Sequence, residues 1–176
     1  MTEHLTVDPL HPDSGLIARA ADCLQYGGLV AFPTETVYGL GVHALNVDAI
    51  KRLFLAKKRP ANDPVIIHVA SLQTLKPLVL ETPWSTLTEH FWPGPLTLVL
   101  PRSQRVPDEI TAGGATVAVR MPNHPVARAL LNKVGLPIAA PSANLFGHPS
   151  PTSAQHVLDD LNDCIDMVVD GGNTPV

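Results

Sequence analysis

Short apolar runs alternate with amphipathic segments along this chain, and prolines stand at the ends of many of them. The apolar runs are only about five residues long, which is typical of buried strands, whereas the amphipathic segments repeat apolar residues with helical spacing. This alternation predicts an α/β sheet covered on both faces. The predicted strands are 29–32, 65–69, 96–100, 116–120, 137–140 and 167–169, and the predicted helices are 14–24, 47–59, 71–80, 84–92, 124–134 and 152–161.

Capping residues and glycines mark the ends of these helices. We predict N-terminal caps at Ser14, at Asn46 or Asp48 and at Thr152, and helix stops at Gly27, Pro60 and Gly135. With 176 residues, the chain can bury one sizeable core. We therefore expect a single domain over residues 14–176, preceded by an N-terminal extension over residues 1–13.

Composition and termini favour a cytoplasmic protein. No apolar run approaches the roughly 18–20 residues that span a bilayer, and the first residues show no basic region followed by an apolar one. Cys23 and Cys164 form no Cys-x-x-Cys pair, so we expect neither a zinc knuckle nor a redox motif. The eight histidines show no metal-ligand spacing, and no metal-binding residue is predicted.

The net charge of −4 argues against a general nucleic-acid coat, but the basic residues are clustered. Five of them fall within nine positions: Lys51, Arg52, Lys57, Lys58 and Arg59. Such a cluster indicates an anionic ligand, and Lys57 and Arg59 could hold phosphates. The alternative is that they only complement the C-terminal end of the helix dipole.

The segment Pro33-Thr34-Glu35-Thr36-Val37-Tyr38-Gly39 follows a predicted strand and is rich in polar groups. Loops at the ends of strands are common ligand-binding positions in α/β proteins, and Gly39 and Gly41 would permit close backbone approach. The segment therefore resembles the wall of a small-molecule site. Equally, it could be a polar turn whose side chains bond their own backbone.

Four other residues carry candidate chemistry. Arg120 ends an apolar strand, so its charge needs either an anionic ligand or an acidic partner. His68 lies inside an apolar strand, where a core role is more common than a catalytic one. Ser142 and Asn144 follow another strand, but Ser142 lacks the Gly-x-Ser-x-Gly elbow, so it is expected to position a ligand oxygen.

Six motifs in order resemble the YrdC/TsaC threonylcarbamoyl-AMP synthase family over residues 15–172. They are Pro33-Thr34-Glu35-Thr36-Val37-Tyr38-Gly39-Leu40, Lys57-x-Arg59-Pro60, His68-Val69, Trp92-Pro93-Gly94-Pro95-Leu96-Thr97, Val119-Arg120-x-Pro122 and Pro141-Ser142-Ala143-Asn144. The resemblance implies an open twisted α/β sheet of mixed strands with helices on its faces and a basic concave ligand cavity. It also implies that the chain ends before a further segment that family members use to complete fold and site.

The resemblance implies a nucleotidyltransferase that joins threonine, bicarbonate and ATP into threonylcarbamoyl-AMP and pyrophosphate, for threonylcarbamoyladenosine (t6A) modification of tRNA. By position, Thr36, His68 and Arg120 would bind threonine. Lys57 and Arg59 would be catalytic, and ATP would be bound by Lys57, Arg59, Asp63, Thr116, Ala140, Ser142, Asn144 and Ser150. Mg²⁺ would accompany ATP, and the downstream partners would be tRNA-modifying enzymes.

Two residues depart from the family pattern, and two other functions stay open. Lys58 replaces a common Gly, and Asp63 replaces an Asn that faces ATP, where a carboxylate would repel phosphate. One alternative function is carbamoyl transfer of the hydrogenase-maturation type. The other is a non-catalytic RNA-binding module that uses the basic cluster, for which we expect only weak, salt-sensitive binding.

Overall fold

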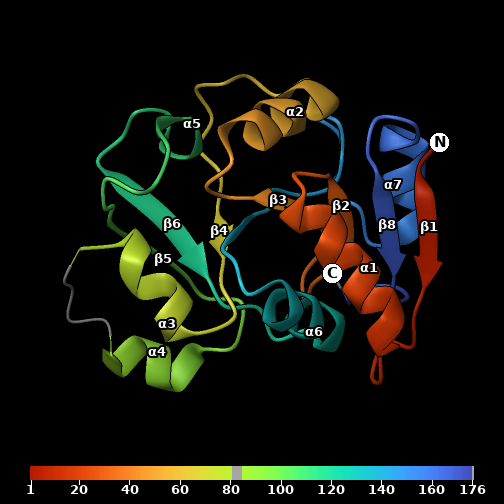
Figure 1. Ribbon diagram of the computed structural model, residues 1–176, viewed down its shortest axis with the longest axis horizontal. Helices are drawn as coiled ribbons and strands as arrows, with labels where there is room; N and C mark the ends of the chain where they lie inside the picture. Colours follow the sequence, from red (N-terminus) through yellow and green to blue (C-terminus); the bar gives the residue numbers. More distant parts are fainter. Residues whose placement is uncertain (81–84, 176) are drawn as a thin grey trace.

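The chain folds around one mixed sheet whose strand order is β1-β8-β2-β3-β7-β4-β6-β5 (Figure 1). The computed structural model describes residues 1–80 and 85–175. Within these ranges the strands are β1 (Glu3–Thr6), β2 (Val30–Pro33), β3 (Tyr38–His43), β4 (Ile67–His68), β5 (Thr97–Pro101), β6 (Thr116–Arg120), β7 (Ile138–Ala139) and β8 (Met167–Asp170). The helices are α1 (Ser14–Gln25), α2 (Val47–Lys57), α3 (Leu72–Leu75), the 3₁₀ helix η1 (Lys76–Leu78), α4 (Ser85–Phe91), α5 (Asp108–Thr111), α6 (Pro125–Val134) and α7 (Ala154–Leu161).

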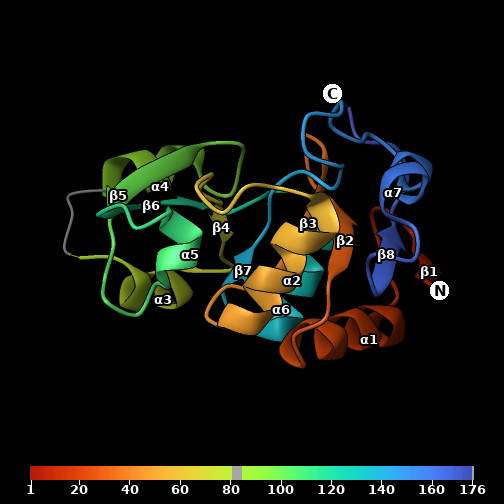
Figure 2. The ribbon, with the colours of Figure 1, turned by 90° about the horizontal axis from the view of Figure 1, so that it is seen from above.

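Alternating side chains of the central strands pack into two separate cores. Val30 and Phe32 of β2 pack with α1 and α6, which lie together on one face (Figure 2), whereas Ala31 between them packs into the core that contains α2 and α7. Met167 and Val168 of β8 are divided between the two cores in the same way. This period of two confirms the predicted α/β sheet of mixed strands with helices on both faces.

The strands β5 and β6 bury one face of their antiparallel pair along its whole length, and the other face only toward Arg120. The buried residues are Leu98, Leu100, Val117 and Val119. On the opposite face, Val99 is 66% exposed and Thr116 is also exposed. Thr116 and Arg120 point to this face from opposite ends of β6, so the strand rise of about 3.3 Å per residue separates them by about 13 Å.

Most predicted elements are confirmed, but several boundaries were wrong. Asp13, not Ser14, caps α1, because its Oδ1 accepts from the N–H groups of Gly15 and Leu16, both at 2.9 Å. Ser153, not Thr152, caps α7. The predicted strand 65–69 shortens to β4, the predicted helix 71–80 divides into α3 and η1, and residue 84 of the predicted helix 84–92 lies outside the described residues.

Three elements were not predicted. β1 lies within residues 1–13, the segment set apart as an extension, and pairs in parallel with β8. β3 pairs antiparallel with β2, so Tyr38–His43 is a strand instead of a loop. α5 is a single short turn of helix. None of the helices in the described part of the chain is long and apolar enough to cross a bilayer.

Lys58 ends α2 in the left-handed region, with a φ of 50°. This conformation costs a residue with a Cβ roughly 1–2 kcal/mol, whereas glycine adopts it freely but loses more entropy on folding. We therefore expect Lys58→Gly to raise the free energy of unfolding by about 0.5–1 kcal/mol, measured by urea denaturation. Lys58→Ala removes the same charge but keeps the Cβ, so an equal gain in that variant would contradict this explanation.

Candidate functional site

The polar segment after β2 is a tight turn that joins β2 to β3. The Thr34 hydroxyl donates to the carbonyl of Val37 (2.7 Å) and lies 3.0 Å from the Thr36 hydroxyl. Tyr38 is fully buried, and its hydroxyl donates to the carbonyl of Gly172 at 2.6 Å. Thr34 and Tyr38 therefore stabilise the turn, as in the polar-turn interpretation, and leave Glu35 and Thr36 to face a neighbouring strand.

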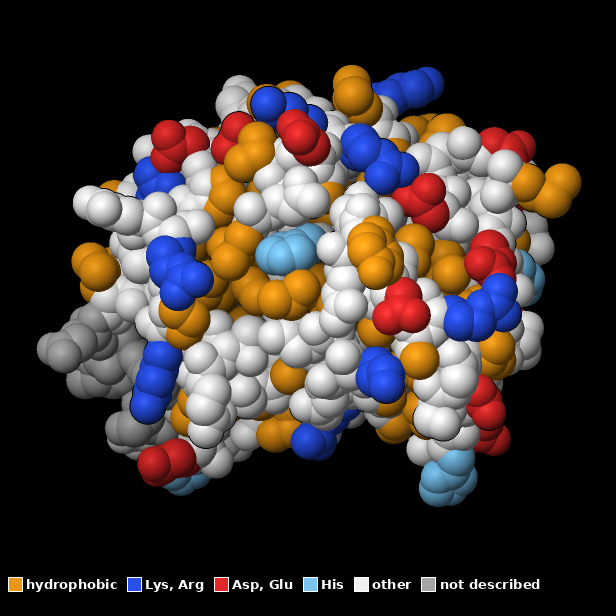
Figure 3. Space-filling model, in the orientation of Figure 1, with side chains coloured by type: hydrophobic (Ala, Val, Ile, Leu, Met, Phe, Trp, Pro, Cys, Tyr) orange, Lys and Arg blue, Asp and Glu red, His pale blue; other side chains and the backbone are white. Residues whose placement is uncertain are grey.

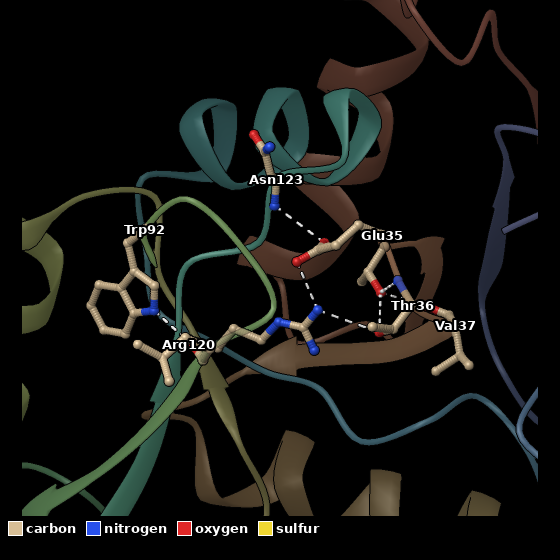
Figure 4. Close-up of polar contacts among 8 residues, drawn as sticks. Glu35, Thr36, Val37, Trp92, Arg120 and Asn123 are labelled. Atoms are coloured by element: carbon tan, nitrogen blue, oxygen red, sulfur yellow. Dashed lines mark hydrogen bonds and ion pairs between the residues drawn. The ribbon is translucent and has the colours of Figure 1, made fainter. Parts of the chain in front are cut away.

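That neighbour is Arg120, at the end of β6. Its Nη2 donates to Glu35 Oε1 at 2.7 Å and to Thr36 Oγ1 at 3.4 Å. The other carboxylate oxygen of Glu35 accepts from the Asn123 N–H at 3.1 Å, so Glu35 lies between Asn123 and Arg120 (Figure 4). Burial alone would raise the pKa of Glu35, but the bonds from Arg120 and Asn123 outweigh it and hold that pKa below its usual range.

Arg120 thus has the acidic partner that was one of its two predicted alternatives, and it still has unused donors. Its side chain is 11% exposed, and its Nε is buried without a hydrogen-bond partner among the described residues. A buried donor without a partner is costly. The guanidinium is therefore oriented by Glu35 but not saturated by it.

His68 lies directly opposite Arg120, because β4 and β6 pair in parallel with these two residues in register. The imidazole is buried, with its ring edge against Phe32 at a centroid distance of 6.5 Å. Its Nδ1 has no hydrogen-bond partner in residues 1–80 and 85–175. Burial, reinforced by the charge of Arg120, lowers the pKa of His68 to about 4, so the ring is neutral at physiological pH.

This burial predicts acid sensitivity. Below its ordinary pKa of 6.5, His68 takes up a proton in the unfolded chain but not in the folded one until the pH approaches 4, so folding becomes less favourable as the pH falls. Arg120 opposes protonation and Glu35 favours it. Between about pH 7 and about pH 5, His68 should remove about 2 kcal/mol from the free energy of unfolding.

The comparison is urea denaturation of wild type and His68→Gln across this pH range. The variant cannot titrate, so its free energy of unfolding should fall less, by the amount assigned to His68. Parallel pH profiles for the two proteins would contradict the burial of a neutral imidazole.

A second group of predicted residues surrounds Lys57, at the end of α2. Its side chain is 1% exposed, and its ammonium donates to the carbonyl of Ser142 at 2.5 Å and to the carbonyl of Asn144. Burial lowers the pKa of Lys57 to about 8. Ala140 precedes this loop, and its N–H is bonded to the carbonyl of Ile66 at 2.9 Å.

Asn144 is buried in an orientation that leaves an acceptor free. Its Nδ2 donates to the carbonyls of Leu145 (2.7 Å) and His148 (2.8 Å), whereas Oδ1 has no hydrogen-bond partner among the described residues. The opposite amide orientation would direct an oxygen at two carbonyls, so the hydrogen bonds fix this one. Asn144 therefore keeps one unused acceptor, whereas its amide hydrogens are already committed.

Arg59 forms a third group with Asp63. The Arg59 guanidinium pairs with the Asp63 carboxylate at 2.9 Å and donates to the carbonyl of Pro64 at 2.9 Å. It also lies over the ring of Phe146, 5.9 Å from its centroid, which connects it to the loop held by Lys57. The carboxylate of Asp63, which departs from the family pattern, is thus paired with a cation of the same proposed site.

The other two predicted nucleotide ligands lie apart. Thr116 is exposed at the far end of β6, and Ser150 lines a hollow of about 300 Å³ with His148, His156 and Asp160. The described residues show no hydrogen bond from Thr116 or Ser150 to the other predicted site residues. In the part of the chain that is described, no group of three or more His, Cys, Asp or Glu side chains could hold a metal ion.

The basic cluster is less concentrated than its sequence suggests. Lys57 is buried, Arg59 is paired, and Arg52 binds the Asp166 carboxylate at 2.9 Å. On the face shown in Figure 3, Lys and Arg side chains alternate with Asp and Glu instead of gathering into one patch. This distribution does not favour the RNA-binding alternative.

Sequence and structure comparisons identify the family. The Sua5/YciO/YrdC family model, described as "Telomere recombination", matches residues 22–176. The chain belongs to this family. The chain is similar to a threonylcarbamoyl-AMP synthase of Pyrococcus abyssi, which is 55% identical over 91% of this chain and 48% of its own length. One from Bacillus subtilis is 51% identical over 96% of this chain and 50% of its own.

A solved member of the family shares the fold described above. It is P. abyssi Sua5 complexed with L-threonine, which superposes with a TM-score of 0.95 at 52% identity, over 98% of this chain and 51% of that protein. The chain therefore spans about half the length of the relatives that it matches. The names of these relatives do not favour the carbamoyl-transfer alternative.

Proposed function

We propose that this chain carries threonylcarbamoyl-AMP synthase activity and forms threonylcarbamoyl-AMP and pyrophosphate from threonine, bicarbonate and ATP. The observation that carries the proposal is the turn of β2 and β3 against β6. There, Arg120 is oriented by Glu35, its guanidinium contacts the Thr36 hydroxyl, and it lies opposite the neutral His68 in the paired strands. The similarity to P. abyssi Sua5, which was solved with L-threonine, supports threonine as a substrate.

Threonine has three groups that such a site would recognise. Arg120 would bind the carboxylate with donors that Glu35 leaves unused, because guanidinium groups match carboxylates in shape and charge. The unpartnered Nδ1 of His68 and the hydroxyl of Thr36, which lies within reach of Arg120, suit the hydroxyl and the amine. Since Glu35 offsets the charge of Arg120, the empty site does not carry an isolated buried cation.

The proposed reaction joins two anions, the carbamate of threonine and ATP. It depends more on their alignment than on a covalent intermediate with the enzyme. The threonine amine attacks the carbon of bicarbonate to give a carbamate, with loss of water. A carbamate oxygen then bonds to the α-phosphorus of ATP, whose bond to the bridging oxygen breaks as pyrophosphate leaves. Arg59 would offset the charge that grows on the pyrophosphate, and Ser142, Asn144, Thr116 and Ser150 would hold the nucleotide.

We propose that Mg²⁺ enters with ATP. A hard cation that is bound mainly by phosphate oxygens needs few protein ligands, and we assign none to it. Its chemistry would be to neutralise phosphate charge. The proposed product would be used by tRNA-modifying enzymes in the cytoplasm, and RNA binding by this chain would be weak.

One assay tests this function against its alternatives. The chain is incubated with radiolabelled ATP, and pyrophosphate release is measured with threonine and bicarbonate present together or omitted singly. Release that requires both supports the proposal. Release that requires carbamoyl phosphate instead would favour the carbamoyl-transfer function, and tight RNA binding at moderate salt without any turnover would favour the RNA-binding module.

A further inference from the structure

The ammonium of Lys57 points into the protein, toward the loop between β7 and α7. It donates to the carbonyls of Ser142 and Asn144, and only 1% of the residue is exposed. A buried ammonium is costly unless its hydrogens find acceptors. Here the acceptors are backbone atoms of the residues whose side chains we assign to the nucleotide.

The same loop is fastened at further points around Lys57. The Phe146 N–H donates to the backbone carbonyl of Lys57 at 2.9 Å, and the Leu145 N–H donates to the carboxylate of Asp160 at 3.0 Å. Asn144 crosslinks the loop through its own amide, as described above. Lys57 is thus the centre of a network that fixes the backbone on both sides of Asn144.

These contacts leave Lys57 poorly placed to bind phosphate directly. Two of its three N–H groups point at carbonyls, and a phosphate would have to displace them or reach a nearly unexposed atom. Arg59, two residues later, is more exposed and already faces the loop through Phe146. The two cations of the Lys-x-Arg motif therefore differ in what they contact.

We propose that Lys57 is a positioning residue. Its ammonium clamps the loop that carries Ser142 and Asn144 by binding their backbone carbonyls, and it does not hold a phosphate. The clamp orders this loop before any ligand arrives. Its consequence for activity rests on the proposed function, because only then are Ser142 and Asn144 nucleotide ligands. The clamp itself does not depend on that function.

Hydrogen exchange of the chain without substrates tests the clamp directly. Lys57→Met removes the donors but keeps an unbranched side chain, and Lys57→Gln removes the charge but keeps two N–H donors. We expect the amides of Leu145 and Phe146 to exchange at least about 10-fold faster in Lys57→Met, because each charge-assisted bond contributes more than a factor of ten. Lys57→Gln should lie closer to wild type, and the amides of β8 should be unchanged in both.

Unchanged exchange at Leu145 and Phe146 in Lys57→Met would overturn the proposal. If that variant also released no pyrophosphate while wild type did, Lys57 would be a direct phosphate ligand. If wild type itself released none, the proposed function would fail, but the exchange result would still decide the clamp.

Amine labelling of wild type gives a second test that needs no variant. The clamp predicts that Lys57 resists an amine-reactive reagent without ATP, whereas the exposed Lys51 and Lys58 react. A Lys57 that reacts readily and becomes protected when ATP is added would contradict it.

Discussion

Replacing Arg120 by alanine should raise the threonine concentration needed for half-maximal pyrophosphate release by about 10- to 150-fold. A charge-assisted hydrogen bond contributes about 1.5–3 kcal/mol, and each 1.4 kcal/mol is roughly a factor of ten in affinity. Arg120 is the cation that Glu35 and the N–H of Asn123 orient at the turn of β2 and β3. The half-saturating concentration of ATP should stay within about twofold of wild type, because Arg120 shares no hydrogen bond or ion pair with Lys57 or Arg59 among the described residues.

The control for this prediction removes the carboxylate that the mutation leaves unpaired. Glu35→Gln combined with Arg120→Ala eliminates repulsion between Glu35 and the threonine carboxylate. The double variant should therefore bind threonine better than Arg120→Ala but worse than wild type. If Arg120→Ala weakened the binding of ATP and of threonine equally, or changed the binding of neither, Arg120 would not be the threonine ligand.

Arg59→Ala should lower the maximal rate of pyrophosphate release by about 10- to 1,000-fold and leave threonine affinity near wild type. The lower part of this range corresponds to one lost charge-assisted contact, and the upper part to loss of a fixed donor that acts mainly in the transition state. Arg59 is suited to this role because its pairing with Asp63 and its contact with Phe146 hold the guanidinium in place. Steady-state rates at saturating threonine and ATP measure the effect.

Asp63→Asn is the matched variant, since it keeps Arg59 but removes the carboxylate beside it. We expect it to retain turnover and to bind ATP at least as tightly as wild type, because an uncharged amide does not repel phosphate. Near-wild-type pyrophosphate release by Arg59→Ala would contradict the role given to Arg59. If Asp63→Asn lowered the rate of pyrophosphate release as much as Arg59→Ala, the ion pair of Arg59 and Asp63 would act as one unit.

The sequence predicted the elements whose patterns are local. α6 was predictable because its apolar residues keep helical spacing and Gly135 ends it. β6 was predictable because the apolar residues Val117, Ala118 and Val119 follow one another directly before Arg120. β1 and β3 were missed because their evidence is not local. β1 is mostly polar and is a strand through its pairing with β8, and β3 carries two glycines within a polar motif.

The sequence also indicated which residues would gather but not how they would be used. The sequence around Arg120 does not predict Glu35 as its partner, because the two residues are 85 positions apart. Lys57 and Arg59 are equivalent in a motif, yet a helix directs one inward and the loop leaves the other near the surface. Thr116 was assigned to the nucleotide by resemblance alone, and the part of Thr116 and Ser150 in nucleotide binding stays a prediction.

The most direct test of the proposed function follows the carbon of bicarbonate. The chain is incubated with threonine, ATP and ¹³C-labelled bicarbonate, and the adenylates are analysed by mass spectrometry. We predict an adenylate that contains threonine and the labelled carbon, formed only when all three substrates are present and reduced in Arg120→Ala. Binding of threonine and ATP without any labelled adenylate in the wild-type chain would contradict the proposed function.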